Sequence, residues 1–140
     1  MGADTGFVYA LDFGKIVSIG LQGNQVVPVV IQHQETNEVL MLGYLNEAAL
    51  EATLRTKEVV LYSTSRRQLW HKGSSSGDYL DVSSVWVNCE QNSLLIKATP
   101  RTGGVCHTTL PTGTHRPSCF YRQLTGWPPS LTNGESDPEG

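Results

Sequence analysis

Three cysteines are the residues of this chain with the most obvious capacity for chemistry. Cys89, Cys106 and Cys119 each flank a polar stretch, and His107 directly follows the second of them. Thiolates are strong zinc ligands, and a catalytic zinc takes three protein ligands and keeps one position for water, whose pKa falls towards ~7. Free cysteine is also among the most buried residue types, so spacing alone leaves ordinary core cysteines as an equal alternative. No CxxC pair occurs, which excludes a compact zinc finger.

Composition narrows the class of protein. The chain has 140 residues, of which 39% are hydrophobic and 16% charged, with 14 glycines, and this is typical of a single sheet- and loop-rich domain. An odd cysteine count argues against a purely internal disulfide framework. The net charge of -3 gives no reason to expect binding to nucleic acid. The start lacks a signal-peptide pattern and no stretch suits a bilayer, so we expect a cytoplasmic protein with reduced thiols and no membrane association.

The apolar patterning predicts an α+β fold, mostly of antiparallel strands with one main helix. Strands are expected at residues 26–32, 39–45, 59–63, 80–87 and 93–98, with a last ordered segment at 118–124. The first two strands should form a hairpin, in which Pro28 indicates an edge position or a bulge. Asn46 is the expected N-cap of a helix over residues 47–55. Leu50 and Leu54 lie four residues apart on that helix, so they should share the face that packs on the sheet.

The end of the chain differs in composition from the rest. Residues 126–140 are rich in proline and polar residues, so we expect them to be disordered. The predicted domain therefore covers residues 1–125.

Several motifs follow one another along the chain. They are EVLMLGYLNEAA at 38–49, STSRR at 63–67, LWHKGSSSG at 69–77, Cys106-His107, and SCFYR at 118–122. In this order they resemble the phosphoribosyl-AMP cyclohydrolase family, which acts in histidine biosynthesis. The resemblance runs from about Val27 to Leu124.

The resemblance implies a particular reaction and assembly. Members of the family hydrolyse the N1–C6 bond of the adenine ring of phosphoribosyl-AMP. They form interleaved homodimers in which three cysteines from both subunits hold zinc. The corresponding positions here are Cys89, Cys106 and Cys119, and His107 is the expected acid–base residue. Its alternative role is to order the loop.

Residues 64–78 carry the groups expected to bind the nucleotide. Cations on a Ser/Gly-rich loop suit oxyanions, so Arg66 and Lys72 should bind substrate phosphates; the alternative is a solvated charged loop. Trp70 could stack on a base, but we expect it to anchor the loop. Further hydroxyl or backbone donors are expected from Ser74, Ser75, Ser76 and Gly77. The remaining histidines, His33, His71 and His115, are expected to be surface residues.

Three departures from the family pattern fall on the site. Asn88, Glu90 and Asn92 stand where the family has aspartates that bind magnesium, and because magnesium prefers anionic oxygens we expect this site to bind it weakly or not at all. Ser74 replaces a common glutamate. The chain between Cys106 and Cys119 is also longer than usual, so the extra residues either bulge outward or reshape access to the pocket.

These departures leave two other functions open. One is hydrolysis of a different purine-like or cyclic amidine substrate. The other is an inactive, zinc-stabilised dimer that binds a nucleotide.

Overall fold

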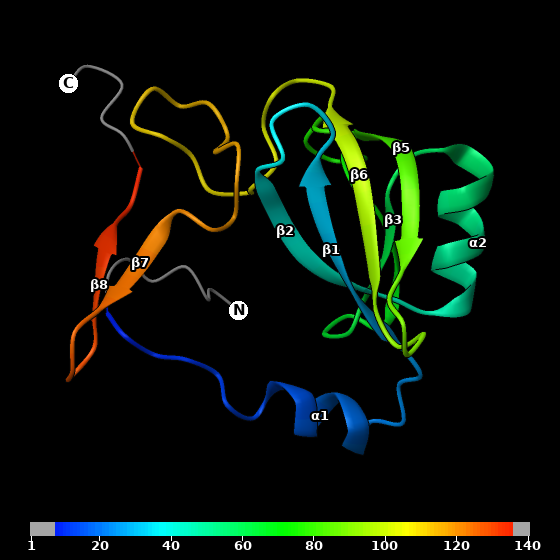
Figure 1. Cartoon of the computed structure of the whole chain (residues 1–140), viewed down its shortest axis with the longest axis horizontal. Coiled ribbons are helices and arrows are strands. Elements are labelled where there is room, and N and C mark those ends of the chain that lie inside the picture. The colour runs from blue at the N-terminus through cyan, green and yellow to red at the C-terminus, as the bar shows by residue number, and fades with distance from the viewer. Residues whose placement is uncertain (1–7, 136–140) are drawn as a thin grey trace.

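A computed structural model describes residues 8–135, and its centre is a four-stranded sheet (Figure 1). The order across the sheet is β2 (Val39–Leu45), β1 (Val27–His33), β6 (Leu94–Pro100) and β5 (Leu80–Val87). β1 pairs antiparallel with β2 and parallel with β6, and β5 pairs antiparallel with β6. The predicted α+β fold of mostly antiparallel strands, with its first hairpin, is confirmed.

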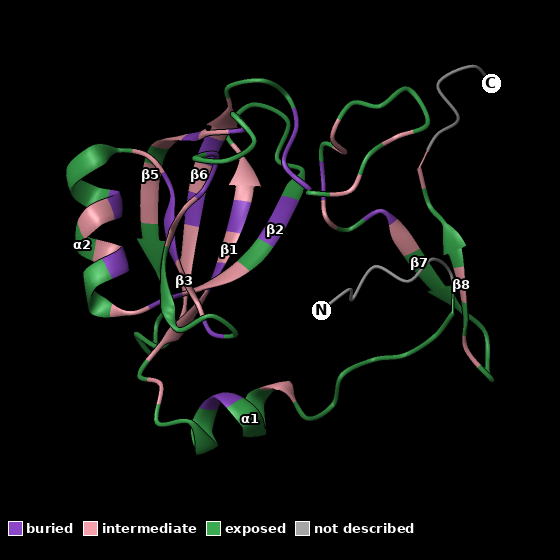
Figure 2. Cartoon of the chain, turned by 180° about the vertical axis from the view of Figure 1, so that it is seen from behind, coloured by how far each residue is buried: buried purple, intermediate pink, exposed green. Residues whose placement is uncertain are grey.

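One face of this sheet forms the core. Side chains alternate between the two faces of a strand, and Val29 and Ile31 on β1 and Ile96 and Ala98 on β6 are fully buried. Figure 2 shows these buried bands running across the sheet towards α2 (Glu47–Thr56). The same apolar cluster includes residues of a second, two-stranded sheet, β3 (Val60–Ser63) with β4 (Gln68–His71). Of the two strands of this second sheet, β3 lies against β2, where Leu61 packs on Gly43.

The helix α2 begins and ends for local reasons. The Asn46 side chain accepts a hydrogen bond of 2.8 Å from the Ala49 N–H, which confirms the predicted N-cap. At the other end Lys57 adopts a left-handed conformation, and its N–H donates to the Thr53 carbonyl. The buried Thr53 hydroxyl also donates to the Val60 carbonyl and accepts from the Val60 N–H, at 2.9 and 3.0 Å. These two bonds attach the helix to the start of β3.

Two local predictions were wrong. Pro28 lies in the interior strand β1 rather than at an edge, and the irregularity of that strand falls at Ile31/Gln32. Pro28 is tolerated in this strand because β1 pairs with β6 only from Val29 onwards. Residue 28 therefore needs no backbone N–H on the side of β6. Leu54 is 55% exposed, since α2 buries Ala49 and Thr53 while Leu50 packs only partly on the core.

The structure also contains elements that the sequence did not indicate. A short helix α1 (Lys15–Leu21) precedes the sheet, and β4 interrupts the segment interpreted as loop. The predicted disorder from residue 126 is wrong for residues 126–135, because β8 (Ser130–Asn133) pairs with β7 (Arg122–Thr125) in a hairpin. Residues 136–140 of the predicted tail lie outside the described residues, and the boundary at residue 125 stays a prediction.

The β7–β8 hairpin and α1 lie beyond the edges of the sheet (Figure 1). Large apolar side chains contact solvent just before α1, at its end and in the hairpin turn: Phe13, Leu21 and Trp127 are each more than 80% exposed. Apolar surface of this kind favours contact with another protein surface. Over residues 8–135, neither helix has the length and hydropathy needed to cross a bilayer.

Candidate functional site

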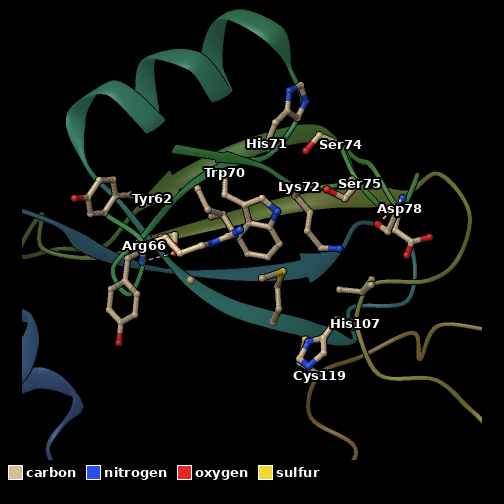
Figure 3. A pocket seen from close by; sticks show the side chains of 18 of the residues that line it. Tyr62, Arg66, Trp70, His71, Lys72, Ser74, Ser75, Asp78, His107 and Cys119 are labelled. Atoms are coloured by element: carbon tan, nitrogen blue, oxygen red, sulfur yellow. Dashed lines mark hydrogen bonds between the residues drawn. The ribbon is translucent and has the colours of Figure 1, made fainter. Parts of the chain in front are cut away.

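A cavity of about 940 Å³ lies between β2, the β3–β4 sheet and the loops that follow β4 and β6. Its volume is within the usual range of small-molecule sites. Figure 3 shows the side chains that enter it. The predicted site residues on its wall are Arg66, Trp70, Lys72, Ser74, Ser75, Ser76, Cys106, His107 and Cys119. Gly77, Cys89 and the turn around it are not part of this wall.

Lys72 is the most unusual residue of the cavity. It follows β4 directly and is only 4% exposed. Within residues 8–135 its Nζ makes no hydrogen bond or ion pair, and it lies 5.9 Å from the centroid of the Trp70 ring. Burial lowers the pKa of Lys72, and the nearby charges of Asp78 and the cavity thiols only partly offset this effect. An anionic ligand would therefore compensate the ammonium for the hydration that it has lost.

The turn after Lys72 is closed by backbone contacts. Gly73 has a φ of +100°, and a Cβ at this position would lie 2.5 Å from the Tyr79 nitrogen, so only glycine fits. The Gly77 N–H donates to the Gly73 carbonyl at 2.7 Å, and the Ser76 hydroxyl accepts from the Asp78 N–H at 3.1 Å. Gly77 thus closes the turn, while the serines before it face the cavity.

Two of the three cysteines come together. Cys106 is buried and Cys119 half-buried, and both line the cavity. The Cys106 Sγ also lies 3.0 Å from the Thr108 hydroxyl. Burial raises the pKa of the Cys119 thiol, and the neighbouring Cys106 raises it further. Two thiolates so close would repel each other without a cation, and zinc accepts such sulfur ligands. The donor type of this pair therefore fits zinc.

Cys89 lies elsewhere, exposed in the turn between β5 and β6. No cluster of three His, Cys, Asp or Glu residues able to hold a metal ion occurs within residues 8–135. Within these residues, Cys89 therefore does not complete a three-cysteine site with Cys106 and Cys119.

The turn around Cys89 is closed by its amides. The Asn88 Oδ1 accepts from the backbone N–H groups of Asn92 and Ser93, at 2.9 and 3.0 Å. The Asn88 Nδ2 donates to the Asn92 Oδ1 at 2.7 Å. Glu90 is exposed. The side-chain oxygens of both asparagines are therefore engaged within the turn itself.

His107 and Arg66 lie at the mouth of the cavity. Both are exposed, and Figure 3 shows His107 beside Cys119, across the cavity from Lys72. The Arg66 backbone N–H donates to the Ser63 hydroxyl at 3.2 Å, within the turn that joins β3 to β4. Trp70 is half-buried and packs against the core cluster, as expected of an anchor, but part of it also lines the cavity.

Two histidines expected at the surface are instead paired with carboxylates. His71 Nε2 lies 2.7 Å from Glu58 Oε1, and hydrogen bonds from Arg101 and then His71 lower the pKa of Glu58. His115 Nδ1 contacts the buried Asp78 carboxylate, and both residues line the cavity. Neither carboxylate was singled out from the sequence. The sole available signal was an isolated Asp at the end of a Ser/Gly-rich loop.

Asp78 keeps its charge in this surrounding. Burial acts to raise its pKa, but hydrogen bonds from Thr102 and His115 and the charges of His115 and Lys72 outweigh it, so the pKa is lowered. The cavity thus contains a carboxylate, a buried cation, a thiol pair and an exposed imidazole. This combination is of the kind found in enzymes that bind charged substrates and transfer protons.

Comparison with known proteins identifies the family. The phosphoribosyl-AMP cyclohydrolase family model matches residues 41–121, and the chain belongs to this family. The predicted family is therefore confirmed, and the predicted enzyme class, a cyclohydrolase, agrees with the names of the relatives. The matched region contains every element that lines the cavity wall from β2 to Cys119.

Individual relatives extend the match. Phosphoribosyl-AMP cyclohydrolase of Streptococcus mutans is 42% identical over 115 residues, which cover 82% of this chain and 93% of that protein. The enzyme of the same name from Clostridium botulinum is 40% identical over 103 residues, 74% of this chain and 88% of that protein. The histidine biosynthesis bifunctional protein HisIE of Staphylococcus epidermidis is 47% identical over 83 residues, 59% of this chain but only 39% of that longer protein.

Proposed function

We propose that this chain hydrolyses the N1–C6 bond of the adenine ring of phosphoribosyl-AMP, as a step of histidine biosynthesis. The observation that carries the proposal is the cavity, in which the buried Lys72 faces the Cys106–Cys119 pair and His107. The family membership and the names of the relatives support the same substrate.

Substrate binding follows from the cavity wall. The Lys72 side chain is almost fully buried and its Nζ has no hydrogen bond within residues 8–135, so it gains a partner when a phosphate enters, and such charge-assisted hydrogen bonds are the strong ones. Arg66 at the rim and the hydroxyls of Ser74 to Ser76 add donors for a second phosphate or a ribose. Trp70 offers the edge of its ring to the base.

The reaction adds water to a ring carbon and breaks a carbon–nitrogen bond. His107 is the exposed acid–base group beside the thiol pair, so it is placed to accept a proton from the attacking water and to donate one to the departing ring nitrogen. Cys106 and Cys119 would hold zinc, which activates water near neutral pH when bound. The half-buried Trp70 and the buried Lys72 form a wall that shields one side of the reacting ring from bulk water.

Zinc binding is proposed to need two copies of the chain. Cys89 lies away from the Cys106–Cys119 pair, and the exposed apolar side chains of α1 and the β7–β8 hairpin favour a homodimer that brings a second Cys89 to the pair. Magnesium is not expected at the Asn88–Asn92 turn, since both amide oxygens are occupied by hydrogen bonds. The cytoplasmic location stays a prediction.

The arrangement across two copies can be tested by mixing variants. Cys89→Ser and Cys106→Ser should each be inactive alone. A heterodimer of the two retains one intact site, so refolding them together at equal amounts should restore about a quarter of wild-type activity if the ligands are shared. If the mixture recovers no activity, either all the zinc ligands belong to one chain or the chain does not form this dimer.

The primary test is turnover of phosphoribosyl-AMP by metal-quantified protein, with and without added magnesium. We expect ring-opened product with zinc alone and no dependence on magnesium. Zinc-loaded protein that gives no product would favour the second candidate, a hydrolase for another purine-like or cyclic amidine substrate. That candidate has one specific observation in its favour, which is the additional histidine, His115, that the long loop adds to the cavity wall.

A further inference from the structure

The loop between Cys106 and Cys119 has its own structure. An isolated bridge pairs Thr109 with His115, and the Arg116 N–H donates to the Thr108 carbonyl at 3.0 Å. At its base the Arg116 carbonyl accepts from the N–H groups of both Val105 and Cys106, each at 2.9 Å. The tip, residues 111–114, is exposed. The loop therefore bulges outward at its tip, while its returning arm is attached beside the thiol pair.

His115 is the residue of this arm that reaches the cavity. Its Nδ1 contacts the Asp78 carboxylate, which also accepts a hydrogen bond from the Thr102 hydroxyl. Gly104 makes room for the contact, because a Cβ there would lie 2.9 Å from the His115 Cβ and 3.2 Å from the Asp78 Oδ1. Asp78 is itself 5% exposed. The orientation of the imidazole is therefore set by three separate segments of the chain.

This orientation leaves one polar atom of the ring free. Since Nδ1–H donates to the Asp78 carboxylate, Nε2 is the ring nitrogen left for a second hydrogen bond. Nε2 has no hydrogen-bond partner within residues 8–135, and it is not among the buried, unsatisfied atoms of that region, so it is accessible. The His115 side chain is 32% exposed and lines the cavity.

We propose that His115 is a substrate-positioning residue, whose Nε2 makes a hydrogen bond with a ribose hydroxyl of the bound nucleotide. This inference rests on the proposed function for the identity of the nucleotide. Asp78 fixes the ring so that little side-chain freedom is lost when substrate binds. The long loop thus adds a contact to the pocket rather than only extending from it.

The test uses substitutions that distinguish the role of Nδ1 from that of Nε2 in the His115 ring. In His115→Asn the amide can still donate to Asp78 in place of Nδ1, but no atom remains at Nε2. In His115→Gln the amide reaches the Nε2 position instead, and His115→Ala removes both. Thr112→Ala, at the exposed tip of the same loop, is the matched control. The measured quantities are KM and kcat for phosphoribosyl-AMP, zinc content and Tm.

We expect the Asn and Ala variants to raise KM by about three- to tenfold with little change in kcat, as for one lost neutral hydrogen bond. Gln should recover part of the loss, and the control should match wild type. A wild-type KM in His115→Asn would overturn the proposal, because the bond to Asp78 would then be the whole role of His115.

The role of His115 can also be tested if the proposed function is wrong. If zinc-loaded wild-type protein does not turn over phosphoribosyl-AMP, calorimetric titration with adenosine 5′-monophosphate replaces the kinetics. Weaker binding in the Asn and Ala variants, with partial recovery in Gln, would still support the role of His115. Equal binding by all variants, or none by the wild type, would refute it.

Discussion

Replacing Lys72 by methionine should weaken ligand binding and stabilise the fold at the same time. The side chain is almost fully buried, and its Nζ keeps only a small contact with solvent and, within residues 8–135, has no hydrogen bond or ion pair to compensate for the hydration it has lost. Methionine keeps most of the apolar stem and removes the charge. We therefore expect Lys72→Met to raise the free energy of unfolding by about 1 kcal/mol, a value at the low end for a buried polar group because the side chain opens to the cavity.

The same substitution, Lys72→Met, should weaken binding of the nucleotide. A hydrogen bond between a cation and a phosphate contributes about 1.5–3 kcal/mol, so the Kd for adenosine 5′-monophosphate should rise by about ten- to 150-fold. Adenosine lacks the phosphate, and its Kd should change little. The preference of the protein for the nucleotide over the nucleoside should therefore nearly disappear in the variant.

Calorimetric titration and urea denaturation measure the two effects, with zinc content determined in parallel. Lys97→Met is the matched control, since Lys97 also lies over an indole ring, that of Trp86, but outside the cavity. The stability difference between wild type and Lys72→Met should narrow as pH rises. The pKa of Lys72 is lower in the folded protein than in the unfolded chain, so the unfolded chain binds the proton more tightly. The wild-type protein therefore gains stability as pH rises from the folded-state pKa to the ordinary lysine pKa. An unchanged nucleotide preference in Lys72→Met would refute the assignment of Lys72 to the phosphate.

Three further predictions concern the frame of the site. Thr53→Val removes both bonds to the Val60 backbone and should lower the free energy of unfolding by about 1–3 kcal/mol in urea denaturation, whereas a neutral result would mean that β3 does not depend on them. The folded pKa of Asp78 is lowered, so its carboxylate stabilises the fold above about pH 4 and that contribution is lost as pH falls further; Asp78→Asn should therefore show a flatter acid-denaturation profile than wild type. Gly104→Ala should displace His115, raise KM and cost about 1–3 kcal/mol, and a wild-type Tm and KM would contradict the close packing at this glycine.

Strands that carry the core were predictable from the sequence because their signals are local. β2 and β5 have the predicted bounds, since β2 is an apolar run and β5 is rich in valine, and each is followed by an asparagine. The Asn46 cap was equally local. β4 was missed because it lies in a polar segment and is stabilised by its partner β3 rather than by its own composition. For β8 likewise, pairing with β7 outweighs a sequence rich in proline and polar residues.

The cavity was only partly predictable for a related reason. Motifs indicated the residues of its wall, but they could not show that Lys72 is buried without a partner, because burial depends on how β4 and its loop pack. The contact between Asp78 and His115 joins positions 37 residues apart. No periodicity or spacing connects two such residues, so the interpretation of His115 as a solvated side chain failed once the loop returned to the cavity.

The amide turn bears on whether the site has decayed. If asparagines stood in this turn because the site no longer functions, there would be no reason for them to hydrogen-bond with each other. Here Asn88 accepts two backbone N–H groups and donates to Asn92, so hydrogen bonds close the turn without a cation. Cys89, between them, stays exposed and available as a ligand. We infer that these amides hold the turn, and Cys89 within it, in place without magnesium.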